Sequence, residues 1–496
     1  MENRYYHSTR GSGKLSPKEA VLRGIADDGG LYVWDGLEDV RLDLDALLKL
    51  DYQEMAKRLF AEVLWDYSEE ELARCVDLAY TGKFDSEQIT PLVMAGDLPV
   101  LELFHGPTSA FKDVALCMLP QLMSTALNGR KEKVMIVTAT SGDTGKAALS
   151  GFQDAENIGI TVFYPYGKVS DIQRLQMVCQ QGENVRVCAI RGNFDDAQSG
   201  VKRLFHSAQA KAALDEDHIV LSSANSINIG RLVPQIVYYF AAYRQLLEAG
   251  AVQMGEEVNF CVPTGNFGNV LAGYYAKLMG LPVHRLIVAA NENNVLEDFL
   301  NTGVYDRNRP FHQTISPSMD ILISSNLERM LYYLSGKDSV RVAGWMKDLA
   351  EQGRYEVDAQ TKEKIASLFL SASCDNAQTS AQIRSVYARC GYVMDPHTAV
   401  GAHVLEQLKD RLDGKVTVLL STASPYKFTR DVLKALGEAQ EGLDDFACMR
   451  KLEQLSKQQI PAGLYALKDM PERFADVISC EEMEEYVIAG AREILK

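Results

Sequence analysis

The sequence predicts an α/β protein in which parallel sheets are covered by helices, preceded by a mainly helical domain. The first observation is a change near Asp97, after which short β-branched runs alternate with stretches long enough for crossover helices. The second is the helical spacing of apolar residues over residues 42–80, as at Leu47, Met55 and Leu72. The third is the length of 496 residues, which exceeds what one small core supports and predicts two or three domains.

The expected strands lie at residues 134–139, 160–164, 185–190, 218–221, 257–262, 284–290 and 416–420. Helical stretches separate them, which is the alternation typical of a parallel sheet with both faces covered. Such sheets bind ligands at the carboxyl ends of their strands. The junctions between a strand and the following helix are therefore where chemistry is expected.

Composition excludes several classes of function. The formal net charge of −16 argues against non-specific binding to nucleic acid or to an anionic membrane. The nine cysteines include no Cys-x-x-Cys pair, and neither they nor His397 and His403 have zinc-ligand spacing. No apolar run approaches the roughly 18 residues that span a bilayer, and the first residues lack a signal-peptide pattern. We therefore expect a cytoplasmic protein with reduced thiols, without a metal, and with neither nucleic-acid nor membrane partners.

The first junction of interest has the sequence PTGNFGN at residues 263–269. Gly265 and Gly268 allow a tight turn and a close approach of the backbone to a ligand. The helix that follows brings backbone N–H groups to one point, which suits a phosphate. A plain strand-to-helix turn would look the same, and two glycines three apart do not make a dinucleotide fingerprint.

The second junction has the sequence TATSGDTGK at residues 138–146. It fails as a P-loop, because Thr140 replaces the required glycine and Ala147 replaces the hydroxyl residue after the lysine. A turn with Ser141 and Thr144 at a helix start suits a carboxylate. Simple capping by Ser141, Asp143 or Thr144 is the alternative.

The third junction has the sequence HGPTSAFKD at residues 105–113, before an apolar helix. Lys112 lies between Phe111 and Asp113 at the start of that helix. Burial and the positive end of the helix dipole would both lower its pKa and make the amine a nucleophile. An exposed lysine beside a helix cap is the alternative.

The fourth junction has the sequence LLSTASP at residues 419–425, where the last strand ends. It places the hydroxyls of Ser421 and Thr422 at the carboxyl edge of the sheet. The alternative is a plain strand end before Pro425. Each junction alone is a weak signal. Together they match pyridoxal phosphate, which needs a covalently bound lysine, an anchored phosphate and a partner for its ring nitrogen.

At this point the sequence resembles the threonine synthase family, in the fold-type-II, tryptophan-synthase-beta-like group of pyridoxal-phosphate enzymes. The resemblance runs nearly end to end and is similar to the long bacterial and fungal branch. It rests on the STR at residues 8–10, EAVL at 19–22, DGGLYV at 28–33, HGPTSAFKD at 105–113, TSGDTG at 140–145, GKVS at 167–170, NSIN at 225–228 with Arg231, GNFGN at 265–269 and STASP at 421–425.

The resemblance implies a set of site residues. Lys112 would be the catalytic residue and would hold the cofactor. The further cofactor-binding residues would be Phe111, Asp143, Gly265, Asn266, Phe267, Gly268, Asn269 and Thr422. The substrate would be bound by Ser141, Gly142 and Thr144 at its carboxylate, and by Asn228 and Arg231 at its phosphate.

The implied reaction converts O-phospho-L-homoserine and water to L-threonine and phosphate, the last step of threonine biosynthesis. A related lyase on the same scaffold, giving a 2-keto acid and ammonia, and a non-catalytic relative are the alternatives. The expected domains are an N-terminal helical domain (1–96), a large cofactor-binding α/β domain (97–130 and 231–496) and a small α/β domain (131–230). The branch resemblance favours a monomer, with a dimer left open.

Overall fold

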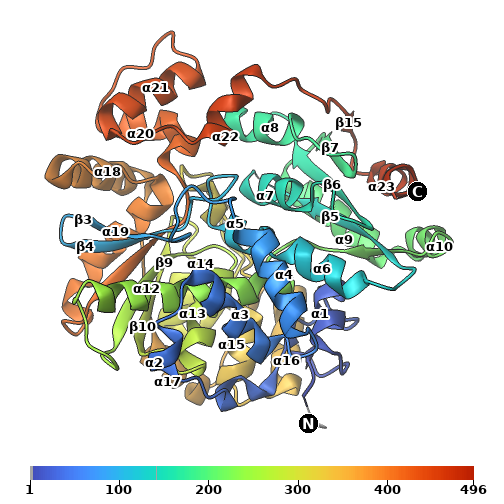
Figure 1. The fold of residues 1–496 in the computed structure, drawn as a ribbon, viewed down its shortest axis with the longest axis horizontal. Coiled ribbons are helices and arrows are strands. Elements are labelled where there is room, and N and C mark those ends of the chain that lie inside the picture. Colours follow the sequence, from blue (N-terminus) through green and yellow to red (C-terminus); the bar gives the residue numbers. More distant parts are fainter. Residues whose placement is uncertain (1–3, 141, 496) are drawn as a thin grey trace.

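The computed structural model describes residues 4–140 and 142–495, which are arranged around a six-stranded and a five-stranded sheet (Figure 1). The six-stranded sheet has the order β13-β10-β9-β14-β4-β3, and the five-stranded sheet the order β15-β7-β6-β5-β8. All pairs in both sheets are parallel except β3 with β4. The predicted fold class is confirmed.

The six-stranded sheet contains three of the expected strands, each within a residue of its expected position. Its strands are β3 (Leu92–Ala95), β4 (Leu98–Glu102), β9 (Val258–Pro263), β10 (Val283–Ala290), β13 (Phe369–Ser373) and β14 (Thr417–Ser421). The sequence-based prediction missed β13, because its residues FLSAS contain no β-branched side chain. It also missed the short hairpin of β3 and β4, which adds an antiparallel edge to the sheet.

The central strands of the five-stranded sheet are buried on both faces. Its strands are β5 (Lys133–Ala139), β6 (Ile158–Pro165), β7 (Val185–Ile190), β8 (Ile219–Ser222) and β15 (Val477–Ile478). In β6, Val162 faces Gly145 of helix α7 (Asp143–Phe152), whereas Gly159 on the opposite face meets Ile494 of α23 (Met483–Ile494). Helices on both faces explain why these strands read as continuous apolar runs.

The other helices cover the two sheets and fill the space between them. In the small-sheet region they are α8 (Asp171–Val178), α9 (Phe194–His206) and α10 (Ala208–Asp215). The remaining helices before the C-terminal segment are α5 (Lys112–Leu116), α6 (Leu119–Leu127), α11 (Ile229–Leu232), α12 (Ile236–Glu248), α13 (Gly268–Leu278), α14 (Val295–Thr302), α15 (Leu327–Leu334), α16 (Ser339–Gln352), α17 (Ala359–Leu368), α18 (Asn376–Cys390), α19 (Pro396–Leu408) and α20 (Thr429–Leu436). A two-stranded antiparallel pair joins β11 (Val304–Asp306) to β12 (Arg354–Glu356).

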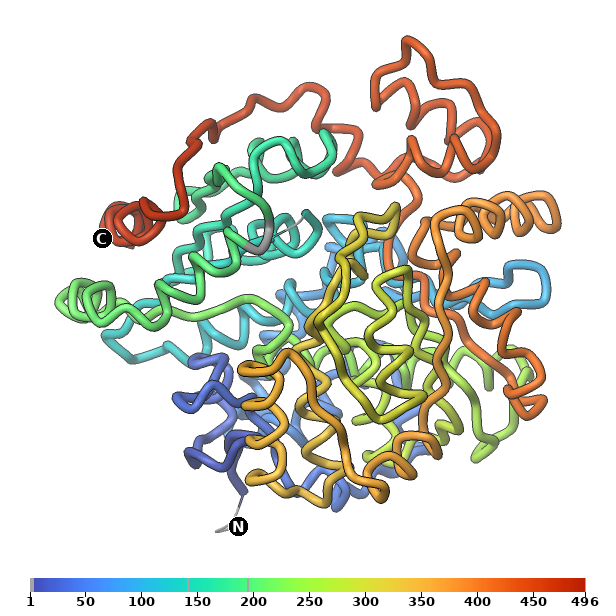
Figure 2. Tube along the Cα trace, turned by 180° about the vertical axis from the view of Figure 1, so that it is seen from behind, coloured from blue at the N-terminus to red at the C-terminus, as the bar shows by residue number. Residues whose placement is uncertain are grey.

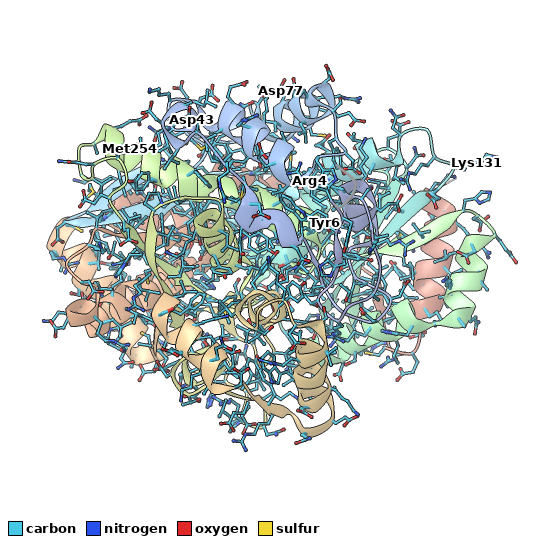
Figure 3. The ribbon with its side chains drawn as sticks, turned by 90° about the horizontal axis from the view of Figure 1, so that it is seen from below. Arg4, Tyr6, Asp43, Asp77, Lys131 and Met254 are labelled. Carbon is cyan, nitrogen blue, oxygen red and sulfur yellow. The ribbon has the colours of Figure 1, made fainter. Side chains whose placement is uncertain are left out.

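The N-terminal region is mainly helical, as predicted. It contains α1 (Pro17–Arg23), α2 (Leu44–Leu47), α3 (Tyr52–Val63) and α4 (Glu69–Tyr80), with a small antiparallel pair of β1 (His7–Ser8) and β2 (Tyr32–Val33). A capping box of Ser68 and Glu71 starts α4, where the two residues satisfy each other's backbone N–H groups. Figure 3 labels Arg4 and Tyr6 of this N-terminal region. Tyr6 stacks on Trp65, with ring centroids 5.4 Å apart.

The C-terminal segment returns from the large sheet to the small one. After α21 (Asp445–Ser456) and α22 (Ala462–Tyr465) the chain crosses the molecule, and β15 pairs with β7 while α23 packs against α9 and α10 (Figure 2). The expected division placed β15 in the large domain, with residues 231–496, and β3 in the N-terminal domain, with residues 1–96. In the structure β15 belongs to the five-stranded sheet and β3 to the six-stranded sheet. None of the helices in residues 4–140 and 142–495 is long and apolar enough to cross a membrane.

Candidate active site

Lys112 and the end of strand β14 meet in the structure. Lys112 is the first residue of α5, and the loop before it forms an antiparallel bridge between Ala110 and Ala423. The Phe111 N–H donates to the Thr422 carbonyl at 2.9 Å, and the Ser424 N–H donates to the Ser109 carbonyl at 3.0 Å. Two of the four predicted junctions therefore share one set of backbone hydrogen bonds, and Thr422 is fixed next to the lysine loop.

Lys112 has an unusual electrostatic environment. Burial lowers its pKa to about 8, with the nearby cations Lys427 and Arg231 acting in the same direction and Asp143 opposing them. The neutral fraction of an amine with this pKa at pH 7 is roughly 300-fold larger than that of a lysine with the ordinary pKa. Lys112 therefore has the property that a nucleophilic or basic lysine requires.

Ser318 connects Lys112 to the rest of the site. It lies in the short 3₁₀ helix η3 (Pro317–Met319), and its Oγ accepts from Lys112 Nζ at 3.4 Å and donates to Asp143 Oδ2 at 3.2 Å. The Ser318 N–H donates to His397 Nε2 at 3.2 Å. Since His397 Nδ1 lies 2.7 Å from Asp395 Oδ1, the ring proton sits on Nδ1 and Nε2 is the acceptor.

Asp143 lies in the second junction, at the start of α7, and is 5% exposed. Burial alone would raise its pKa, but the ammonium groups of Lys427 and Lys112 outweigh it and hold the pKa well below its usual range. Asp143 is therefore an anion at neutral pH. The predicted site residue Ser141 lies outside the described residues.

The turn before Asp143 is held by Thr140. Its Oγ1 accepts the N–H groups of Gly142 at 3.0 Å and Gly145 at 2.9 Å. Gly142 has a φ of 145°, and a Cβ there would lie 2.4 Å from Gln173 Nε2. Gly142 is buried and Thr144 half-buried. The structure thus explains the glycine, while the predicted binding of a carboxylate by this turn stays a prediction.

The glycine loop (residues 263–269) connects β9 to α13. The residue with left-handed backbone in this loop is Phe267, with a φ of 63°, while Gly265 and Gly268 have no positive φ. Gly265 is required for space instead, because a Cβ there would lie 2.4 Å from the Ser318 carbonyl oxygen. The loop therefore packs directly on the segment that contacts Lys112. It leads into the start of α13, and the first backbone N–H groups of a helix have no carbonyl partner within it and can bind an anion.

Neutral side chains hold the glycine loop in place. Ser324 Oγ donates to the Gly265 carbonyl at 2.9 Å, and Asn269 Nδ2 donates to the Pro263 carbonyl at 2.9 Å. Asn326 Nδ2 donates to the Asn266 carbonyl at 3.2 Å and to the Ser226 carbonyl at 3.1 Å. The same asparagine thus connects the loop with the segment that contains Asn228 and Arg231.

Asn228 and Arg231 have different environments. Asn228 is fully buried, its Nδ2 donates to the carbonyls of Val21 and Ser223, and its Oδ1 caps the N–H of Gly230 at 2.9 Å. Its amide group is therefore occupied by structural contacts. Arg231 is 2% exposed and donates to the Ala224 carbonyl, whereas its Nε has no hydrogen-bond partner among the described residues. A buried guanidinium with an unused donor is a good candidate for binding an anion.

Sequence reasoning missed several residues of the site. Ser318 and Lys427 were not predicted, and His397 was interpreted only as a residue without zinc spacing. Lys427 lies two residues after Pro425 in an apolar run, which is a weak signal of a buried lysine. Ser318 gives no local signal, because its position depends on a long loop that returns to Lys112. Within residues 4–140 and 142–495, no group of three or more His, Cys, Asp or Glu side chains is arranged to hold a metal ion.

Comparison with known proteins identifies the family. The family described as "Pyridoxal-phosphate dependent enzyme" matches residues 85–373, "Threonine synthase N terminus" matches residues 5–80, and "Threonine synthase, C-terminal" matches residues 398–487. The threonine synthase of Pseudomonas aeruginosa is 40% identical over 439 residues, which cover 88% of this chain and 91% of that protein. The chain belongs to the threonine synthase family. Pyridoxal phosphate as the cofactor of this family confirms what the four junctions predicted.

Other similarities support the same family. The chain resembles the crystal structure of pyridoxal-phosphate-bound threonine synthase from Brucella melitensis with a TM-score of 0.87 and 38% identity, over 99% of this chain and 100% of that one. It is also 36% identical to the human protein named threonine synthase-like 1 over 496 residues, which cover 96% of this chain. The chain spans only 65% of the length of that human protein.

Proposed function

We propose that this chain converts O-phospho-L-homoserine and water to L-threonine and phosphate. Family membership supports a pyridoxal-phosphate enzyme, and the observation that carries the substrate assignment is Arg231. Its buried guanidinium has an unused Nε and acts on the pKa of Lys112, so an anion-binding group lies beside the reactive lysine. A phosphorylated amino acid needs such a group, whereas a hydroxy amino acid does not.

The residues present fit the cofactor. Lys112 is half-buried and its amine has a lowered pKa, which suits covalent attachment to an aldehyde. The glycine loop lies against Ser318, whose side chain contacts Lys112, so a phosphate on the loop and an aldehyde at the lysine can belong to one molecule. When bound, pyridoxal phosphate supplies the electron sink for the carbon next to the substrate's amino group.

The chain's own residues divide the remaining tasks. We assign to Lys112 the proton transfers at the substrate's α and β carbons, because an amine with a pKa near 8 exchanges protons readily at neutral pH. Thr422, 5% exposed and fixed by the lysine loop, offers a neutral hydroxyl to the cofactor ring. Arg231 rather than Asn228 binds the substrate phosphate, since the amide of Asn228 is already in use.

The substrate carboxylate is assigned to the turn that includes Gly142 and Thr144.

Nine cysteines without disulfide partners fit a reducing compartment, which supports a cytoplasmic location. We propose that the chain acts as a monomer, as the likeness to the long branch of the family favours.

One assay tests the proposed reaction. The purified chain, supplied with pyridoxal phosphate, is incubated with O-phospho-L-homoserine while phosphate and threonine are measured together. We expect the two products in equal amounts. Phosphate with a 2-keto acid and ammonia would identify a related lyase instead, and no phosphate release would contradict both assignments.

A further inference from the structure

A second lysine, unlike Lys112 a fully buried one, lies next to the proposed reactive residue. Lys427 belongs to the 3₁₀ helix η5 (Pro425–Phe428), directly after strand β14, and its side chain is completely buried. Its Nζ lies 2.7 Å from Asp143 Oδ1 and donates to the Thr108 carbonyl at 3.0 Å. Burying an ammonium group costs free energy unless the group is paired with an anion. The fold therefore requires the contact between Lys427 and the Asp143 carboxylate.

Lys112 has only an indirect contact with the same carboxylate. Oδ1 of Asp143 is used by Lys427 and by Gln173 Nε2 at 3.2 Å. Oδ2 accepts from Ser318 Oγ, and the Lys112 Nζ hydrogen-bonds to that hydroxyl, not to the carboxylate. Two lysines thus compete for one anion, and the structure gives the direct ion pair to Lys427.

We propose that Lys427 is a positioning residue that occupies Asp143 and so prevents this carboxylate from pairing directly with Lys112. A direct pair would hold Lys112 in its protonated form, in which the amine can neither attack an aldehyde nor accept a proton. Lys427 has no contact of its own with the reacting atoms in this account. The catalytic purpose of the arrangement rests on the proposed function, in which Lys112 is the reactive amine.

The charges around Lys112 set the direction of each expected effect. Asp143 and Asp113 raise its pKa, whereas Lys427 and Arg231 lower it, and burial is the largest influence. The ammonium groups of Lys427 and Lys112 in turn keep Asp143 ionised. Removing only Lys427 leaves Asp143 as an uncompensated anion beside Lys112, so the pKa of Lys112 must rise. Removing only Asp143 leaves a bare cation, so the pKa must fall.

The experiment measures the pKa of Lys112 in the full-length chain freed of cofactor. A small amount of acetic anhydride is added at a series of values from about pH 6 to pH 10, and acetylation of the Lys112 peptide is followed by mass spectrometry. The variants are Lys427→Met, Asp143→Asn, the double variant with both changes, and Lys434→Met as a control at an exposed position of α20. Circular dichroism verifies that each variant is folded.

We expect Lys427→Met to raise the pKa of Lys112 by at least one unit, which makes its acetylation at pH 7 about tenfold slower. Asp143→Asn should lower the pKa, the double variant should lie between the two single variants, and Lys434→Met should match the native chain. An unchanged or lowered pKa in Lys427→Met overturns the proposal.

The double variant keeps the test decisive if Lys427→Met does not fold, because neither charge of the buried pair remains. Its Lys112 pKa must then be higher than that of Asp143→Asn, and an equal value overturns the proposal. The labelling needs neither cofactor nor substrate. A chain without synthase activity but with these pKa shifts would refute the proposed function and leave the role of Lys427 standing. A chain with synthase activity but without these shifts would support the proposed function and overturn the role of Lys427.

Discussion

Two regions of the site are stabilised in opposite ways. The charged cluster of Lys112, Asp143 and Lys427 is assembled from α5, α7 and η5, which lie far apart in the sequence, and full charges hold it together. The glycine loop is one short segment between β9 and α13, and neutral hydroxyl and amide groups of Ser324, Asn326 and Asn269 hold it. One region sets protonation states, and the other sets the shape of a backbone.

This difference suggests what each region tolerates. A neutral loop keeps its N–H groups available and adds no charge that would compete with an incoming phosphate. The charged cluster instead balances two cations against one anion in a buried place, where each charge acts strongly on the others. We therefore expect changes of charge to alter reactivity at Lys112, and changes of volume to damage the loop.

The largest effect is expected at Arg231, which extends the charged region towards the proposed substrate phosphate. Arg231→Ala should lower kcat/KM for O-phospho-L-homoserine by about 10³-fold, which corresponds to about 4 kcal/mol, since a buried charge-assisted contact is lost. Arg231→Lys should recover part of the loss, because it restores the charge but not the planar fork. Steady-state kinetics with unchanged kcat and KM in Arg231→Ala would remove this residue from the site.

A medium effect is expected from volume in the glycine loop. Gly265→Ala places a Cβ 2.4 Å from the Ser318 carbonyl oxygen, and the shift this forces should lower the free energy of unfolding by about 1–3 kcal/mol. Gly268→Ala is the matched control, because its nearest neighbour would be 3.5 Å away and the residue begins a helix. It should raise the free energy of unfolding by about 0.4–1 kcal/mol. Denaturant unfolding of the cofactor-free chain measures both, and equal effects at the two glycines would contradict the packing argument.

The smallest effect is expected at Ser318, a neutral member placed between the two regions. Ser318→Ala removes one donor to Asp143 and one acceptor for Lys112, each about 0.5–1.5 kcal/mol. The acetylation rate of Lys112 at pH 7 should change by less than tenfold, and thus less than in Lys427→Met. Ser367→Ala, at an exposed position of α17, is the control. A larger change in Ser318→Ala than in Lys427→Met would mean that hydrogen bonding, not charge, dominates the cluster.

The two regions also differ in how far the sequence predicts them. The glycine loop was found from seven consecutive residues, because strand, turn and helix start are local features. The left-handed backbone of Phe267 was not predicted, nor was the steric reason for Gly265, since the carbonyl that Gly265 avoids belongs to Ser318. The fold class followed from the alternation of strands and helices, and all seven expected strands form.

The charged cluster was predicted only in part. Lys112 and Asp143 were identified from their motifs. The partner of Asp143 could not be identified in this way, because Lys427 lies far along the chain, in η5 after strand β14. The structural role of Asn228 was likewise hidden, since its partner carbonyl belongs to Val21 in the N-terminal helix α1. Residues that meet through tertiary contacts leave no periodic or local signal in the sequence.

The central claim is that Lys112 is the residue to which the cofactor is bound. The purified chain is supplied with pyridoxal phosphate, reduced with borohydride and digested, and the modified peptide is mapped by mass spectrometry. The account predicts a single modification at Lys112. A modification at the buried neighbour Lys427, at any other lysine, or at none would contradict it.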